Sequence, residues 1–179
     1  MPNFPRLRGM IAATFTPMTE TGDINYAEIK PYADYIASTA IDGVFVNGTT
    51  GEFSSLTVEE RKKILECWIT AAAGRFKVIC HAGSNCQRDS IEIAAHAASI
   101  GAYGIGCIAP SFFKPATVND LIGFFAPIAD AAPELPFYYY NMPSITGVNL
   151  PVDRILAEGR KIIPNLAGTK FTPGSYTHL

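Results

Sequence analysis

The residues best suited to chemistry in this sequence are a lysine, a tyrosine and a pair of threonines. Lys170 lies in the segment GTKF, Tyr140 ends the aromatic run FYYY, and Thr49 and Thr50 lie in NGTTGE. An ammonium is costly to remove from water, so a lysine inside a protein tends toward a neutral amine, which can attack a carbonyl carbon. A phenol can relay a proton, and hydroxyls can donate hydrogen bonds to a carboxylate. These groups would suit amine attack on a carbonyl compound that carries a carboxylate.

Each of these signals alone also has a structural explanation. Gly48 and Gly51 would let the backbone approach a bound carboxylate closely, but a threonine pair between glycines also makes an ordinary turn. Tyr140 could be a core tyrosine whose hydroxyl finds a backbone partner, and Lys170 could extend its ammonium to the surface. His81 could face the site, but it has no carboxylate beside it in sequence, so we favour a structural histidine.

Short apolar runs alternate with helical patterns along the chain, which is typical of parallel strands joined by crossover helices. We expect strands at 9–17, 43–48, 76–83, 104–110, 136–140 and 165–171. We expect helices at 25–40, 57–74, 87–101, 117–132 and about 151–159. Thr57 and Thr117 should each open a capping box with the acidic residue three positions on. Asn25 is an expected N-cap of the first helix, and Pro31 predicts a bend or a late start there.

The alternation predicts an α/β fold, and a barrel fits it better than a dinucleotide-binding fold because no GxGxxG follows the first strand. Six expected strands are two fewer than a TIM (β/α)8 barrel has, and such a barrel needs roughly 250 residues. We therefore expect residues 1–173 to be the N-terminal six-strand portion of a TIM barrel, truncated after about six βα units. Residues 174–179 have no periodicity, and we expect either a natural terminus or a non-native tail.

The predicted chemistry would lie at one end of this barrel. Active sites of (β/α) barrels form at the carboxyl ends of the strands, which is where the three segments fall. Successive residues of a strand point to opposite faces, so Tyr138 and Tyr140 should share one face and Tyr139 should lie on the other. If the shared face is the barrel interior, Tyr140 lies nearest the mouth.

Composition excludes several classes of protein. With 48% hydrophobic and 17% charged residues, the chain is globular rather than disordered. The net charge of −2, without a Lys/Arg cluster that has interleaved aromatic residues, argues against nucleic-acid binding. The apolar runs are strand-length and the N-terminus has no apolar signal region, so we expect neither a membrane span nor secretion. The four cysteines have no CxxC spacing, which favours reduced thiols in the cytoplasm over a metal site or a disulfide frame.

Taken in chain order, GTTGE, then YYYNMP followed by TGV, then GTK resemble the signatures of the pyruvate-dependent class I aldolases, the superfamily of N-acetylneuraminate lyases and dihydrodipicolinate synthases. The resemblance extends from about Leu7 to Phe171 and includes GMIAATFTPMTETGDIN and SLTVEERKKILE. It implies a TIM barrel that uses a covalent imine and therefore no metal or organic cofactor. It also implies small-molecule substrates and, for the intact protein, a cytoplasmic homotetramer.

The resemblance also implies a role for each of the residues that opened this section. Lys170 matches the lysine that forms a Schiff base with pyruvate in that superfamily. Tyr140 matches the tyrosine that moves protons beside the imine. Thr49 and Thr50 match the pair that holds the pyruvoyl carboxylate.

Two departures favour the lyase branch of the superfamily. Synthases usually carry Ser-Arg-Thr-Gly after Tyr-Asn-x-Pro, and here Ile145 stands in place of the arginine, whose bidentate charge it cannot replace. Synthases also carry a tyrosine after the fourth strand, where this chain has Phe112 and Phe113. We therefore expect a carbon–carbon lyase of sialic acid catabolism that cleaves N-acetylneuraminate to N-acetylmannosamine and pyruvate. The alternatives are dihydrodipicolinate synthase, another 2-keto-3-deoxy sugar acid aldolase, and an inactive truncated fragment.

Overall fold

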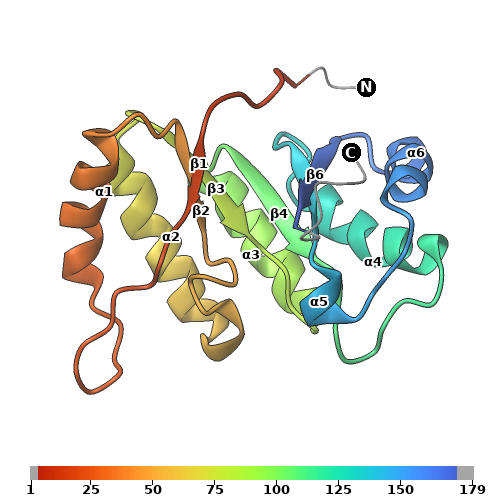
Figure 1. The fold of residues 1–179 in the computed structure, drawn as a ribbon, viewed down its shortest axis with the longest axis horizontal. Coiled ribbons are helices and arrows are strands. Elements are labelled where there is room, and N and C mark those ends of the chain that lie inside the picture. The colour runs from red at the N-terminus through yellow and green to blue at the C-terminus, as the bar shows by residue number, and fades with distance from the viewer. Residues whose placement is uncertain (1–3, 173–179) are drawn as a thin grey trace.

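Six parallel strands form one sheet in the computed structural model, which describes residues 4–172 (Figure 1). They are β1 (Ile11–Ala13), β2 (Gly43–Val46), β3 (Lys77–His81), β4 (Gly104–Ile108), β5 (Phe137–Asn141) and β6 (Leu166–Phe171). The strands lie side by side in chain order, and each pairs in parallel with the next. This is the order of a TIM barrel, so the chain forms a half-barrel, as predicted. The expected tail at 174–179 lies outside the described residues.

The connecting helices cover the outer face of this half-barrel (Figure 1). They are α1 (Ile29–Ala37), α2 (Val58–Ala72), α3 (Gln87–Ser99), α4 (Val118–Asp130) and α6 (Val152–Ile162). The short helix α5 (Pro143–Thr146) lies at the carboxyl end of the sheet, and the 3-10 turns η1 (Tyr26–Glu28) and η2 (Phe53–Ser55) belong to the connections. Trp68 of α2, Ile93 of α3 and Phe125 of α4 are buried in the core between helices and sheet. None of the helices within residues 4–172 has the length and apolarity that crossing a membrane requires.

Both predicted capping boxes are confirmed. The Thr57 hydroxyl accepts a hydrogen bond from the Glu60 amide, and the Glu60 carboxylate accepts one from the Thr57 amide. Thr117 and Asp120 form the same pair at the start of α4. Each box gives hydrogen-bond partners to two backbone amides at the start of its helix. It thereby fixes the residue at which α2 or α4 begins after the preceding strand.

The first helix starts late, as Pro31 predicts. The chain passes through η1 before α1 begins at Ile29, so Pro31 is the third residue of α1, where no amide is needed for the helical ladder. The prediction for Asn25 is wrong, because its side chain makes no capping hydrogen bond. The first strand is also shorter than predicted, since β1 covers only Ile11–Ala13.

At the carboxyl end of the sheet, β2 and β5 end at residues other than those predicted. β2 stops at Val46 because Asn47 adopts a left-handed φ of 59°, which a strand cannot continue. β5 runs one residue further than predicted, through Asn141. The short helix α5 follows it, with Pro143 at its first position, where proline's fixed φ suits a helix start.

The two faces of the sheet carry different sets of side chains. Tyr139 packs in the core on the helix side, while Tyr140 belongs to a smaller buried cluster on the inner face. The other fully buried members of that inner cluster are Phe45, Ile79 and Ile108. Tyr138 lines a cavity on the same inner face. The predicted alternation of the three tyrosines is therefore confirmed, and the shared face of Tyr138 and Tyr140 is the barrel interior.

Candidate active site

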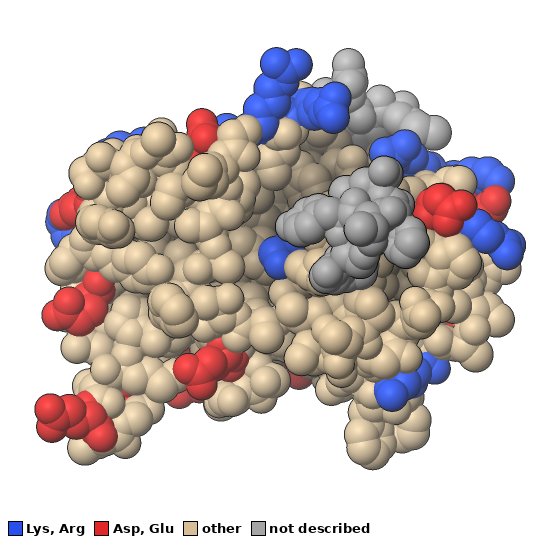
Figure 2. Space-filling view, viewed as in Figure 1, with Lys and Arg blue, Asp and Glu red and all other residues tan. Residues whose placement is uncertain are grey.

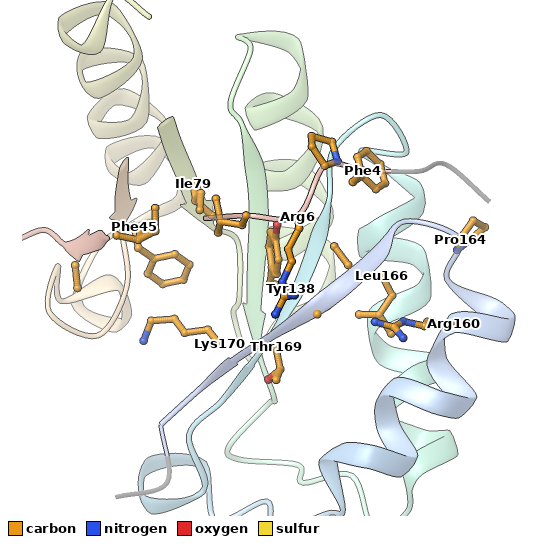
Figure 3. Close-up of a pocket in the computed structure, with 16 residues that line it drawn as sticks. Phe4, Arg6, Phe45, Ile79, Tyr138, Arg160, Pro164, Leu166, Thr169 and Lys170 are labelled. Atoms are coloured by element: carbon orange, nitrogen blue, oxygen red, sulfur yellow. The ribbon is translucent and has the colours of Figure 1, made fainter. Parts of the chain in front are cut away.

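Lys170 and Tyr140 lie beside each other at the carboxyl end of the sheet. They are paired in the register of β5 and β6, so both side chains point to the inner face. The Lys170 Nζ lies 3.7 Å from the centroid of the Tyr140 ring and 5.3 Å from that of Phe45. Figure 3 shows the lysine side chain extending from β6 toward Phe45. The two rings lie beside the Lys170 side chain on the inner face, where the residue is half-buried.

Thr49 joins this pair from the other side of the barrel interior. Its hydroxyl lies 3.2 Å from the hydroxyl of Tyr140, although the two residues are 91 positions apart. The sulfur of Met142 lies 3.5 Å from each of these two hydroxyls. The structure thus brings together three of the predicted site residues, with a direct hydroxyl-to-hydroxyl contact along which a proton can pass.

The turn that carries Thr49 and Thr50 is shaped to leave backbone amides free. It follows Asn47, whose left-handed conformation turns the chain out of β2. Among residues 4–172, no acceptor bonds the amides of Thr49 and Thr50. The Thr50 side chain is half-buried in the same turn. Free amides and hydroxyls pointing from one tight turn are a common way of holding a carboxylate.

The two glycines of this turn are required by the protein's own packing. A Cβ on Gly48 would lie 2.9 Å from the ring of Phe45. A Cβ on Gly51 would lie 3.2 Å from the carbonyl oxygen of Thr14, and the Gly51 carbonyl itself accepts a hydrogen bond from Thr16. The sequence predicts glycines that admit a ligand, whereas here the close neighbours are Phe45 and the chain after β1.

His81 lies on the inner face between the turn and Tyr140. It is fully buried, and its Nδ1 donates to the carbonyl oxygen of Asn47 at 2.9 Å. Its ring centroid lies 5.7 Å from that of Tyr140 and 4.5 Å from that of Phe53. Burial, followed by the charge of Arg61, lowers the pKa of His81 well below its ordinary value, so the ring is neutral at physiological pH. The histidine has a backbone partner, as the structural interpretation expects, and it also forms a wall of the site.

Sequence reasoning missed three residues of the site. Phe45 stacks under Lys170, Met142 contacts both hydroxyls, and Arg61 is buried behind the turn with 3% of its surface exposed. A signal for Arg61 exists in the sequence, because it continues the buried stripe of α2. That stripe consists of Arg61, Ile64, Leu65, Trp68 and Ala72.

The residues that separate the two branches of the superfamily lie in the loops after β4 and β5. Phe112 and Phe113 are 77% and 86% exposed, and their loop is held by the Asn85 side chain, which accepts from the amides of Ser111 and Phe112. Ile145 is 59% exposed in α5. Neither loop places a phenol or a guanidinium at these positions.

A cavity of about 820 Å³ opens on the inner face beside Lys170. Phe45, Ile79 and Tyr138 line it, together with Lys170 and the N-terminal segment 4–7 (Figure 3). Its lining includes Lys170 but not Tyr140, Thr49 or Thr50, so the cavity follows the inner face toward the amino end of the sheet and meets the candidate site only at the lysine. On the part of the molecular face in Figure 2 that the described residues form, charged side chains lie mostly toward the rim and make no continuous basic surface.

Comparison with known proteins agrees with this geometry. Residues 6–179 match the Dihydrodipicolinate synthetase family. N-acetylneuraminate lyase A of Xenopus laevis is 47% identical over 169 residues, which cover 93% of this chain and 55% of the relative. The N-acetylneuraminate lyase of Homo sapiens is 46% identical over 173 residues, 94% of this chain and 54% of the relative. The chain thus spans about half the length of the curated relatives it matches.

Solved structures give the same picture. Proteus mirabilis N-acetylneuraminate lyase superposes with a TM-score of 0.92 at 38% identity, covering 96% of this chain and 58% of that one. Ruminococcus gnavus sialic acid aldolase, solved as a catalytic lysine mutant, gives 0.88 at 32% identity, covering 97% and 56%. Dihydrodipicolinate synthase from Aquifex aeolicus gives 0.87 at 31% identity, covering 94% and 56%.

Proposed function

This chain belongs to the dihydrodipicolinate synthetase family, and we propose that the complete protein carrying it cleaves N-acetylneuraminate to N-acetylmannosamine and pyruvate. The observation that carries the proposal is the placement of the Lys170 amine 3.7 Å from the Tyr140 ring, whose hydroxyl contacts Thr49. The relatives that are named N-acetylneuraminate lyase at 46–47% identity support the choice of substrate.

Lys170 would act as the nucleophile. Its neutral amine attacks the keto carbon of the open-chain sugar acid, and loss of water leaves an imine. The protonated imine withdraws electrons from the bond between the third and fourth carbons, so that bond breaks and its electron pair forms an enamine. Protonation of the enamine and hydrolysis of the imine release pyruvate and regenerate the amine. The imine itself is the electron sink, so this route requires no metal or organic cofactor.

Tyr140 would handle the proton that the cleavage releases. When the carbon–carbon bond breaks, the hydroxyl on the fourth carbon must lose its proton as it becomes the aldehyde. The phenol can first give its own proton to the hydroxide that leaves as the imine forms, and the resulting phenolate then takes the proton of the hydroxyl and passes it to the enamine carbon. We therefore assign Tyr140 as the acid–base group and Thr49, whose hydroxyl lies 3.2 Å away, as the residue that donates a hydrogen bond to the phenolate.

Thr49 and Thr50 would also hold the substrate carboxylate through their free amides. Fixing the carboxylate at the turn aims the adjacent keto carbon at the amine, and such orientation supplies a large part of the rate enhancement in reactions between bound groups. Gly48 and Gly51 support this role indirectly, because any side chain there would displace the turn from Phe45 and from the chain after β1.

A second candidate function is that of dihydrodipicolinate synthase or of another pyruvate-dependent aldolase for 2-keto-3-deoxy sugar acids. The TM-score of 0.87 with the Aquifex aeolicus synthase supports it, since the same half-barrel serves both branches. Ile145 and Phe112 count against the synthase, because neither can bind a second carboxylate or relay a proton. Turnover of N-acetylneuraminate compared with that of pyruvate plus aspartate semialdehyde distinguishes the two.

Trapping of the imine tests the chemistry itself. The complete protein is incubated with pyruvate, reduced with borohydride and digested, and the modified peptide is identified by mass spectrometry. We expect a single adduct on Lys170, and none in the Lys170→Ala variant. An adduct on another lysine, or none in the folded protein, would reject the aldolase proposal.

A further inference from the structure

A buried arginine lies directly behind the threonine turn. Arg61, on α2, donates from Nη2 to the carbonyl oxygen of His81 at 2.8 Å. Its own carbonyl oxygen accepts from the side-chain amide of Asn47 at 2.8 Å. His81 closes the set, because its ring donates to the carbonyl oxygen of Asn47. Three residues that are 3% exposed or less, from three separate elements, thus form a closed triangle of hydrogen bonds.

The guanidinium of Arg61 makes no direct ion pair within residues 4–172, although the charge of Asp89 partly offsets the lowering of its pKa by burial. The Nε of Arg61 has no hydrogen-bond partner there. The guanidinium lies 5.4 Å from the ring centroid of Phe53. Burial lowers the pKa of Arg61, but from a value so high that the group stays charged at neutral pH. A buried charge without a direct ion pair is costly, so the protein retains it at a cost in stability.

This triangle sets the backbone of the proposed carboxylate site. Asn47 is the residue with the left-handed conformation that starts the turn. Its side-chain amide donates to the backbone carbonyl of Arg61, and its own carbonyl accepts from the His81 ring. The Arg61 guanidinium reaches the turn through His81, whose carbonyl oxygen it bonds. The turn is closed on its far side by the Phe53 amide, which donates to the Gly48 carbonyl at 3.3 Å. The direction of the free amides at Thr49 and Thr50 therefore depends on the triangle.

We propose that Arg61 is a positioning residue for the carboxylate of the keto acid. This inference rests on the proposed function and adds to it the residue that makes the site prefer an anion. The Arg61 guanidinium acts through His81, whose carbonyl it bonds and whose ring bonds Asn47 at the start of the turn, and through a fixed positive charge near the turn. A negative ligand adds a counter-charge beyond that of Asp89 to a guanidinium that makes no direct ion pair in the described residues, and a neutral ketone does not.

The test compares a charged and an uncharged substrate at the same amine. Imine formation on Lys170 is followed by borohydride trapping at increasing concentrations of pyruvate or of methyl pyruvate, in the complete protein. In Arg61→Met, we expect the concentration of pyruvate needed for half-maximal trapping to rise about 10- to 100-fold, while trapping of the methyl ester changes little. Arg61→Lys keeps the charge and one donor, so it should retain most of the preference for pyruvate. Arg75→Met, the same change at a partly exposed arginine paired with Asp34, is the matched control.

The outcomes separate this inference from the proposed function. An equal loss of trapping with pyruvate and methyl pyruvate in a folded Arg61→Met protein would show a merely structural arginine and would overturn the inference alone. Should Arg61→Met not fold, Arg61→Gln makes the same comparison, because it removes the charge and keeps a donor. Absence of trapping on Lys170 in the unsubstituted protein would overturn the proposed function and this inference with it.

Discussion

Replacement of Tyr140 by phenylalanine removes one oxygen from the centre of the site and leaves the ring. That ring is 3% exposed, lies 3.7 Å from the Lys170 amine and meets Phe45 edge-on with centroids 5.5 Å apart. The lost hydroxyl contacts Thr49 at 3.2 Å and the sulfur of Met142 at 3.5 Å. We expect Tyr140→Phe to fold and to lose about 1 kcal/mol of unfolding free energy, the usual net value of one hydrogen bond.

The effect on catalysis should be much larger. A positioned acid–base group contributes about 10²- to 10⁴-fold to a rate, which is about 2.7–5.4 kcal/mol of activation free energy. We expect kcat for N-acetylneuraminate cleavage to fall by that factor in the complete protein. The borohydride adduct of pyruvate on Lys170 should still form, because the amine, the ring beneath it and the threonine turn are unchanged.

Tyr139→Phe is the matched control for this experiment. It deletes the same hydroxyl from the neighbouring residue, whose side chain packs against the helices instead of the barrel interior. Turnover and trapping are measured for both variants beside thermal unfolding. Tyr139→Phe should keep its turnover, and a Tyr140→Phe enzyme equally active would refute the assignment of the phenol as the acid–base group.

Three further predictions concern stability and reactivity. Thr57→Ala removes the cap of α2 and should lower the free energy of unfolding by about 1 kcal/mol in urea titrations, and an unchanged midpoint would contradict the capping argument. Burial lowers the pKa of His81, so below about pH 6.5 the unfolded chain takes up a proton there that the folded chain does not. The free energy of unfolding should therefore fall from about pH 7 to pH 5, less steeply in His81→Asn, and equal slopes would argue against a neutral buried ring. Burial raises the pKa of Cys80 to about 12, so at about pH 8 iodoacetamide should label the exposed Cys86 in the native protein and Cys80 only after unfolding, as mass spectrometry would show.

Local and periodic features of the fold could be predicted from the sequence. The alternation of strands and helices leads to the parallel half-barrel because a short crossover places each strand beside the one before it. The capping boxes at Thr57 and Thr117 depend on residues three apart, so no tertiary contact is needed to find them. The period of two in a strand places Tyr140 inside and Tyr139 outside once the inner face is known.

The features that could not be predicted depend on contacts between distant segments. Arg61 lies in the charged run EERKK, and although its spacing from Ile64 and Leu65 marks the buried side of α2, the sequence does not reveal its hydrogen bond to the His81 carbonyl. The end of β2 at Val46 follows from the conformation of Asn47, which its bonds to Arg61 and His81 stabilise. The Thr49 hydroxyl contacts the Tyr140 hydroxyl because the fold brings the turn after β2 close to the end of β5. The resemblance to the aldolases implied a role for each of these residues but not the contact between them.

Sequential strand pairing has a consequence for how the protein is made. Every paired strand lies roughly one βα unit from its partner, as between Gly43 and Lys77 or between Ile105 and Phe137, so each can dock soon after it leaves the ribosome. The turn that carries Thr49 and Thr50 follows β2 and is synthesised early. Tyr140 follows in β5, after four βα units, and Lys170 is added only with β6. The proposed nucleophile Lys170 therefore joins the inner face only after the five strands before it, and the turn that carries Thr49 and Thr50, have been synthesised.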